Sequence, residues 1–225
     1  MDTRKSDVTI SLSRIYYLFF QNYGPQHWWP GDGLFEMMVG AILTQSTSWT
    51  NVEKAIQNLK QTGSLSPPAI RNIDIDRLAA LIHSSGYYHV KAKKLKALAG
   101  WLAGYDDNLA VIFAKHLTDL RQELLNVYGI GEETADSILL YAAGKPVFVI
   151  DAYTRRIISR IGLPVAGSNY ADYQKLFMNN MPHNSEVFNE YHALLVEHGK
   201  SICRKLPLCR QCCISGICSF YRSKR

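Results

Sequence analysis

The spacing of the apolar residues constrains the fold of this chain more than any other feature, because it follows the period of an α-helix almost throughout. Between residues 50 and 60, Val52, Ile56 and Leu59 fall on one helical face, and Ser48 is suited to cap that helix. The same periodicity predicts further helices close to residues 12–20, 33–45, 73–86, 91–105, 116–127, 132–143, 151–161, 170–180 and 186–200. The only strand-like run, 145–150, is too isolated to build a sheet. We therefore predict an all-α fold.

Composition narrows the class of protein. A chain of 225 residues with 47% hydrophobic residues can bury a core in one domain or in two small ones. Its 25 Lys and Arg against 19 Asp and Glu give a net charge of +6, which favours a polyanionic partner, although a basic surface can also be merely solvated. The sequence has no apolar run of membrane-spanning length and no apolar signal-peptide core near its start. We expect an intracellular, cytoplasmic protein without a membrane partner.

All five cysteines lie in the last part of the chain. They are Cys203, Cys209, Cys212, Cys213 and Cys218, and without Cys213 they follow the spacing C-x5-C-x2-C-x5-C. In an intracellular chain, such a cluster predicts a metal site rather than a set of disulfides. Thiolates at this spacing can hold either zinc or a [4Fe–4S] cluster, and the spacing does not choose between them. It also leaves open which of Cys212 and Cys213 is the ligand.

The stretch YGIGEETA, residues 128–135, predicts a helix, a tight turn and a second helix. Gly129 and Gly131 would supply backbone angles that other residues resist. The amides that begin the second helix could then bind a phosphate, although a plain helix–helix connection would have the same pattern. Further along the chain, Asp151 stands where a helix begins, and its ordinary role there is that of an N-cap.

The order of these features resembles the endonuclease III family of helix-hairpin-helix DNA glycosylases. The resemblance spans residues 35–218 and includes HALLVEHGKSIC before the cysteine cluster. It implies a six-helix barrel at 27–144, a cluster domain formed by 1–26 and 145–225, and a DNA cleft between them. It also implies a [4Fe–4S] cluster on four cysteines and phosphate contacts from the hairpin. The cluster ligands would be Cys203, Cys209, Cys212 and Cys218, and the hairpin contacts would be Gly129, Ile130, Gly131 and Thr134. The first cysteine interval is one residue shorter than the family pattern.

The resemblance also implies a reaction. Asp151 matches the essential aspartate of the family, and Glu133 stands where members that also cut the backbone carry a lysine. Because a carboxylate cannot form an imine, we expect a monofunctional glycosylase with weak or no lyase activity. It would flip a damaged base out of double-stranded DNA and hydrolyse its N-glycosidic bond, with Asp151 stabilising the charge on the sugar. The main non-enzymatic alternative is a DNA-binding iron–sulfur module that has lost turnover.

Further residues match family positions that contact DNA. Gln45 matches the family's glutamine that fills the gap left by the flipped nucleotide, and Tyr87 matches the family's wedge residue, although a helix-end glutamine and a surface tyrosine would look the same. The pattern WWP followed by LTQ-x-T-x-W resembles the 3-methyladenine glycosylase branch, which implies an alkylated purine stacked on Trp28, Trp29 and Trp49. The tryptophans could instead be packing residues, with a uracil or thymine mismatch or an oxidised pyrimidine as the substrate. Arg204 and Lys205 are candidates for phosphate contacts, and we expect the protein to act as a monomer.

Overall fold

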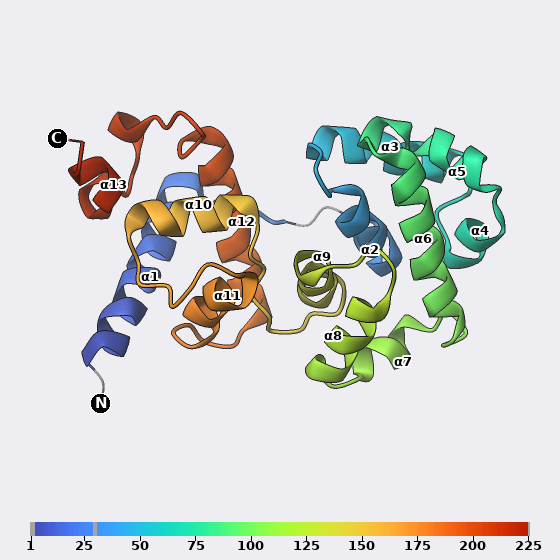
Figure 1. The fold of residues 1–225 in the computed structure, drawn as a ribbon, viewed down its shortest axis with the longest axis horizontal. Coiled ribbons are helices and arrows are strands. Elements are labelled where there is room, and N and C mark those ends of the chain that lie inside the picture. Colours follow the sequence, from blue (N-terminus) through green and yellow to red (C-terminus); the bar gives the residue numbers. More distant parts are fainter. Residues whose placement is uncertain (1–2, 29–30, 225) are drawn as a thin grey trace. The chain divides into compact units, whose positions relative to one another are not determined.

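The computed structural model describes residues 3–28 and 31–224, and every regular element in these ranges is a helix (Figure 1). The predicted all-α fold is therefore confirmed. The chain divides into two compact units. Residues 1–28 and 146–225 form what we call the terminal unit, and residues 29–145 form the central unit.

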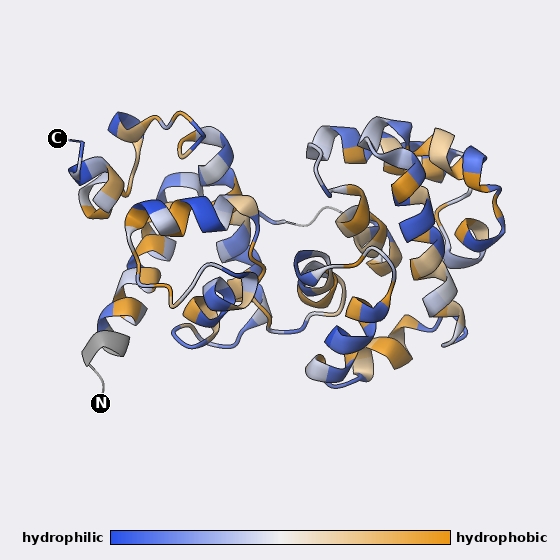
Figure 2. Cartoon of the chain, viewed as in Figure 1, coloured by the Kyte–Doolittle hydropathy of each residue, from blue (hydrophilic) through white to orange (hydrophobic). Residues whose placement is uncertain are grey.

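The central unit is built around α2 (Leu34–Leu43). Its remaining helices are α3 (Trp49–Gln61), α4 (Pro67–Asn72), α5 (Ile75–Leu81), the 3-10 turn η1 (His83–Ser85), α6 (Tyr88–Ala103), α7 (Leu109–Ala114), α8 (Leu117–Asn126), α9 (Glu132–Ser137) and the π-helical turn η2 (Ile138–Ala142). Apolar residues dominate α2, whose Met38, Val39 and Ile42 are fully buried (Figure 2). A helix that is apolar on most sides needs neighbours around it. Here α3, α6 and η2 pack against α2 and form the core.

The terminal unit joins the two ends of the chain. It contains α1 (Thr3–Tyr23), α10 (Ala152–Ile161), α11 (Tyr170–Met178), α12 (Ser185–Ser201), the short turns η3 (Cys209–Gln211) and η4 (Ser215–Ile217), and α13 (Ser219–Arg222). Both α1 and α10 pack against α12. Phe148 lies at the centre of the core, where its ring stacks on Phe177 at 3.8 Å between centroids.

The strand-like run at 145–150 crosses this core without a strand partner. Val147, Phe148 and Ile150 are buried, so the backbone polar groups between them need other hydrogen-bond partners. Side chains of α11 supply two of these partners. Tyr170 Oη accepts a hydrogen bond from the Ile150 amide (3.2 Å), and Gln174 Nε2 donates one to the Phe148 carbonyl (2.8 Å). The segment is thereby fixed, and it leads directly to Asp151.

Several predicted helix ends differ from the observed ones. The predicted helix 73–86 is shorter, because the side chain of Asp74 caps α5 and the 3-10 turn η1 follows it. The predicted helix 132–143 changes from α to π geometry at Ile138. Ser48 occupies the N-cap position of α3, but its side chain makes no capping hydrogen bond. Across the two described ranges, no helix is both long and apolar enough to cross a membrane.

Candidate functional site

Asp151 is the N-cap of α10, as the sequence predicts. Its Oδ1 accepts a hydrogen bond from the Thr154 amide at 2.7 Å, and its backbone is extended. The residue is only 9% exposed, so the carboxylate lies at the edge of the unit's core. Its second oxygen, Oδ2, lies 3.8 Å from Nε2 of His192 on α12. The cap thus fixes one carboxylate oxygen and leaves the other facing an imidazole.

His192 connects Asp151 to Trp28. The imidazole is 4% exposed, and burial lowers its pKa, while the charge of Asp151 acts in the opposite direction. The Trp28 ring lies 5.6 Å from the imidazole, at 31° between the ring planes. Lys200 Nζ lies over the same indole, 5.9 Å from its centroid. Asp151, His192 and Trp28 therefore form one contiguous group within the terminal unit.

Asp151 and Trp28 were predicted from the sequence, but His192 was not. A signal was present, because His192 begins the motif HALLVEHGKSIC, which carried part of the family resemblance. Trp29 lies outside the described residues. Trp49 begins α3 in the central unit, where its Nε1 donates to Glu53 Oε1 at 2.7 Å.

The helix-hairpin-helix consists of α8, a turn and α9. Gly129 has φ of +81°, and a Cβ added there would overlap the Lys94 side chain. Gly131 differs: its φ is −95°, and an added Cβ would meet no atom within 4 Å. The prediction that both glycines supply unusual backbone angles is therefore correct for Gly129 and wrong for Gly131. The backbone angles at position 131 do not require a glycine, and its absent side chain leaves open space there.

The other predicted hairpin contacts point inward. Ile130 is buried, and its amide donates to the Val127 carbonyl at 3.1 Å. The hydroxyl of the buried Thr134 accepts from Gln45 Nε2 at 2.8 Å. A phosphate at this turn would therefore meet backbone at the exposed Gly131 rather than the side chains of Ile130 or Thr134.

Gln45 is anchored to the hairpin. Besides the bond to Thr134, its Nε2 donates to the Gly129 carbonyl at 3.1 Å, and Lys94 Nζ donates to its Oε1. Tyr87, by contrast, is 73% exposed and has a left-handed backbone, with φ of 47°. Both residues belong to the central unit.

The two glutamates of the hairpin have different surroundings. Glu132 Oε1 lies 3.6 Å from Arg121 Nη2, and Arg121 also binds both oxygens of the fully buried Asp136. Glu133 is exposed in the first turn of α9, where negative charge complements the helix dipole.

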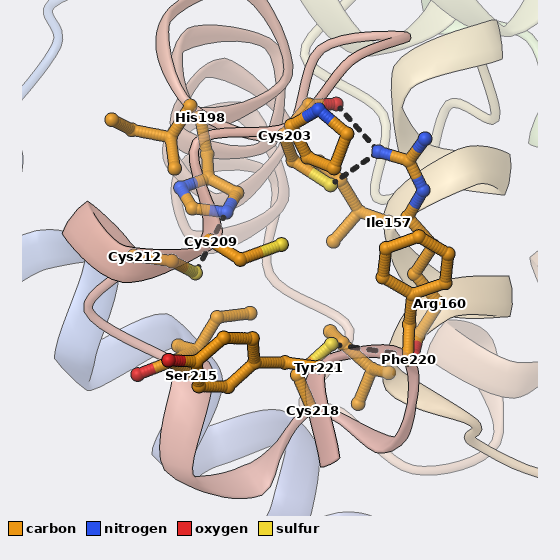
Figure 3. A pocket seen from close by; sticks show the side chains of 14 residues that line it. Ile157, Arg160, His198, Cys203, Cys209, Cys212, Ser215, Cys218, Phe220 and Tyr221 are labelled. Carbon is orange, nitrogen blue, oxygen red and sulfur yellow. Dashed lines mark hydrogen bonds between the residues drawn. The ribbon is translucent and has the colours of Figure 1, made fainter. Parts of the chain in front are cut away.

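Four of the cysteines line one cavity in the terminal unit (Figure 3). They are Cys203, Cys209, Cys212 and Cys218, the four that the family pattern selects; Cys213 is not among the lining residues. None of the five cysteines forms a disulfide. Burial raises the pKa of Cys212 to about 12, so a metal centre binding there would have to displace its proton. Within residues 3–28 and 31–224, no three His, Cys, Asp or Glu side chains are placed to hold a single metal ion.

Polar groups surround this cavity. Arg160 Nη1 donates to Cys203 Sγ at 3.3 Å, and Cys218 Sγ donates to the Arg160 carbonyl at 3.3 Å (Figure 3). His198 Nε2 lies 3.6 Å from Cys212 Sγ, and its Nδ1 lies 2.7 Å from Tyr23 Oη. Burial lowers the pKa of His198 to about 4, which keeps the imidazole neutral. Four thiols with an arginine and a neutral histidine behind them fit an iron–sulfur cluster, whose sulfurs accept hydrogen bonds.

The loop that follows Cys203 presents its charges outward. Arg160 donates to the carbonyls of Arg204 (2.7 Å) and Lys205 (3.0 Å), while both of these side chains are exposed. The backbone of the loop is thus held from inside, and two cations face the solvent.

A buried aspartate cap, a helix-hairpin-helix and a cysteine-lined cavity on one all-helical chain define a class of DNA repair protein. Residues 39–183 match the family described as HhH-GPD superfamily base excision DNA repair protein. The chain belongs to this family, and it is a DNA glycosylase of base excision repair.

Individual relatives agree with this assignment. The chain is 45% identical over 210 residues to a Methanocaldococcus jannaschii protein named "Putative DNA repair glycosylase", covering 92% of this chain and 95% of that one. It resembles the crystal structure of the H. pylori 3-methyladenine DNA glycosylase bound to 1,N6-ethenoadenine, with a TM-score of 0.71 and 27% identity over 89% of this chain and 98% of that one. A trapped endonuclease III–DNA covalent intermediate gives a TM-score of 0.81 at 20% identity over 98% of both chains, which supports the fold alone.

Proposed function

We propose that this protein is a monofunctional glycosylase that removes alkylated purines, such as 3-methyladenine, from double-stranded DNA. The observation that carries the proposal is the geometry of Asp151. One carboxylate oxygen is held by the Thr154 amide, and the other faces the buried His192. Such a carboxylate has a fixed orientation and is suited to stabilise positive charge that develops on a deoxyribose.

In the proposed reaction, the bond between C1′ and the base nitrogen breaks, and its electron pair leaves with the base. The charge that develops on the sugar lies against Asp151, and a water molecule adds to C1′ and releases its proton to solvent. An N3-alkylated adenine carries a positive charge before cleavage, so it leaves as a neutral base without help from a strong acid. The target nucleotide has to leave the duplex first.

Glu133 supports hydrolysis without a lyase step. It occupies the first turn of α9, at the position where bifunctional relatives carry the lysine that attacks C1′. A carboxylate has no amine with which to form a Schiff base. The proposed reaction therefore ends at the abasic site.

Two observations support an alkylated purine as the substrate. The first is the similarity to the H. pylori 3-methyladenine glycosylase. The second is Trp28, whose ring lies close to His192 and so to Asp151, and which already has the Lys200 ammonium over it. An indole in this place attracts cations, and an alkylated purine is a cation.

We assign the [4Fe–4S] cluster of the family to Cys203, Cys209, Cys212 and Cys218, because these four thiols line one cavity. When bound, the cluster would supply a rigid centre for the loops around it rather than bond chemistry. The exposed Arg204 and Lys205 would then contact DNA phosphates. In this proposal the terminal unit is the cluster domain, the central unit is the six-helix barrel, and DNA binds to a single copy of the protein.

A panel of lesions tests the proposal. The iron-loaded protein is incubated with duplexes that contain 3-methyladenine, 1,N6-ethenoadenine, uracil or thymine opposite guanine, and an oxidised pyrimidine. We expect release of the alkylated purines and no borohydride-trapped adduct on abasic DNA. Release of uracil or thymine alone would overturn the substrate class. Binding without release of any base would indicate a non-catalytic module.

A further inference from the structure

Lys91 is a buried lysine for which the proposed chemistry has no use. It lies in the first turns of α6 and is 2% exposed. Its Nζ donates to the carbonyl of Leu43 at 2.8 Å and to that of Ser85 at 2.6 Å. These carbonyls belong to two different elements, the last turn of α2 and the 3-10 turn η1, so a single ammonium joins them.

The two carbonyls lie shortly before Gln45 and Tyr87, the residues that match the family's gap-filling and wedge positions. Gln45 follows Leu43 by two positions, and Tyr87 follows Ser85 by two. Directly after Ser85, the chain turns through two residues with positive φ, Gly86 (φ 69°) and Tyr87 (φ 47°). A left-handed backbone is disfavoured for a tyrosine, so this turn needs contacts that hold it in place.

A methionine at position 91 would fill the same space without a charge to bury. Burial lowers the pKa of Lys91 to about 8, because a low-dielectric environment disfavours the charged form. The carbonyl of Leu43 lies at the negative end of the α2 dipole, which compensates part of that charge. The ammonium is therefore suited to joining the two carbonyls rather than to filling the core.

The same helix also holds the side chain of Gln45. Lys94, one turn after Lys91, donates to Gln45 Oε1, and Gln45 Nε2 donates to the hairpin at Gly129 and Thr134. Helix α6 packs against α2 and η1 within the central unit (Figure 1). Lys91 thus holds the backbone of both segments, and Lys94 holds one of the side chains.

We propose that Lys91 is a positioning residue that fixes the separation of Gln45 and Tyr87, so that both enter the duplex together when the target nucleotide is extruded. The inference rests on the proposed function, because it requires a glycosylase that flips bases. It assigns Lys91 no contact with DNA and no chemical step.

The test compares Lys91→Met with Lys93→Met, a matched control that removes an exposed lysine from the same helix. Flipping is measured by the fluorescence of 2-aminopurine beside an abasic analogue. Base release is measured in single turnover from a paired lesion and from the same lesion in an unpaired bulge. We expect Lys91→Met to lower flipping and release from the paired lesion by about tenfold, the order of one charged hydrogen bond. Release from the bulge should change less than about twofold, because an unpaired base requires less opening.

A purely structural role would lower both release rates together, and that result would overturn the inference. Unchanged flipping by Lys91→Met would overturn it as well. If Lys91→Met does not fold, Lys91→Gln keeps an uncharged NH2 group, with two N–H donors, near the two carbonyls, and the ratio of paired to unpaired release is read from it in the same way. The fluorescence signal does not require base release, so it tests Lys91 even if the lesion panel shows no excision.

Discussion

Replacing Asp151 with asparagine separates its role as the N-cap of α10 from its proposed role in catalysis. As the N-cap of α10, the carboxylate accepts one hydrogen bond, from the Thr154 amide. An asparagine side-chain oxygen can accept the same bond, and asparagine is about as good an N-cap as aspartate. We therefore expect Asp151→Asn to fold with a melting temperature within about 2 °C of the native value, because only a weak charge–dipole term, roughly 0.3–0.5 kcal/mol, is lost.

The reaction should respond differently. A unit negative charge about 4 Å from a unit positive charge contributes about 4 kcal/mol at an effective dielectric constant near 20. The sugar carries only part of that charge in the transition state, so a loss of about 3–4 kcal/mol, or a factor of roughly 10²–10³ in rate, is expected. Ground-state DNA affinity should change little, because the carboxylate acts on charge that develops during cleavage.

The assay is single-turnover release of an alkylated purine, run beside thermal unfolding, with Asp151→Ala as the comparison. Alanine removes both the charge and the cap, so it should show the same loss of rate and a destabilisation of about 1 kcal/mol, or roughly 2–4 °C. A rate for Asp151→Asn within threefold of the native rate would refute the catalytic role. A melting temperature as low as that of Asp151→Ala would refute the capping argument.

Three further predictions concern the hairpin and the loop after the first cysteine. Glu133→Lys should create a borohydride-trapped adduct on abasic DNA that the native protein and Glu133→Gln lack, because it places an amine at the family's nucleophile position. Gly129→Ala should lower the melting temperature by several degrees, because its left-handed backbone alone costs about 1–2 kcal/mol and the steric overlap of the new Cβ adds more. Gly131→Ala should melt within about 1 °C of the native protein, and equal melting temperatures for the two variants would contradict this reasoning. Arg204→Ala and Lys205→Ala should each reduce the slope of log affinity against log salt by about 0.9, measured by titration of an undamaged duplex, and an unchanged slope would remove that side chain from the phosphate contacts.

The sequence was sufficient for the helical class and for the local role of Asp151. Both depend on patterns within a few residues: apolar spacing in one case, and a carboxylate at a helix start in the other. The left-handed conformation of Gly129 was predictable for the same reason. Gly131 was interpreted in the same way and has ordinary backbone angles, since the sequence does not distinguish a glycine that is needed for φ from one that leaves space.

What the sequence did not reveal depends on contacts between distant residues. His192 meets Asp151 and Trp28 only after α12 has packed against α10. Lys91 stands among several lysines of α6, yet it is buried and bonded to a carbonyl 48 residues away. Such positions are set by tertiary packing. The periodicity of the sequence shows which face of a helix is apolar, but not which distant residues that face contacts.

Helix α10 joins Asp151, the proposed catalytic carboxylate, to the cysteine-lined cavity within the terminal unit. Asp151 caps its first turn, and Arg160 in its last turn holds the carbonyls of Arg204 and Lys205. A helix of 10 residues spans about 15 Å and is rigid over that length. The loop that carries Arg204 and Lys205 is therefore held at a fixed distance from Asp151. If these residues act on DNA as proposed, this coupling would give the cysteine cluster a part in catalysis without any chemistry of its own, because a one-ångström error in placing a reacting group can cost about two orders of magnitude in rate.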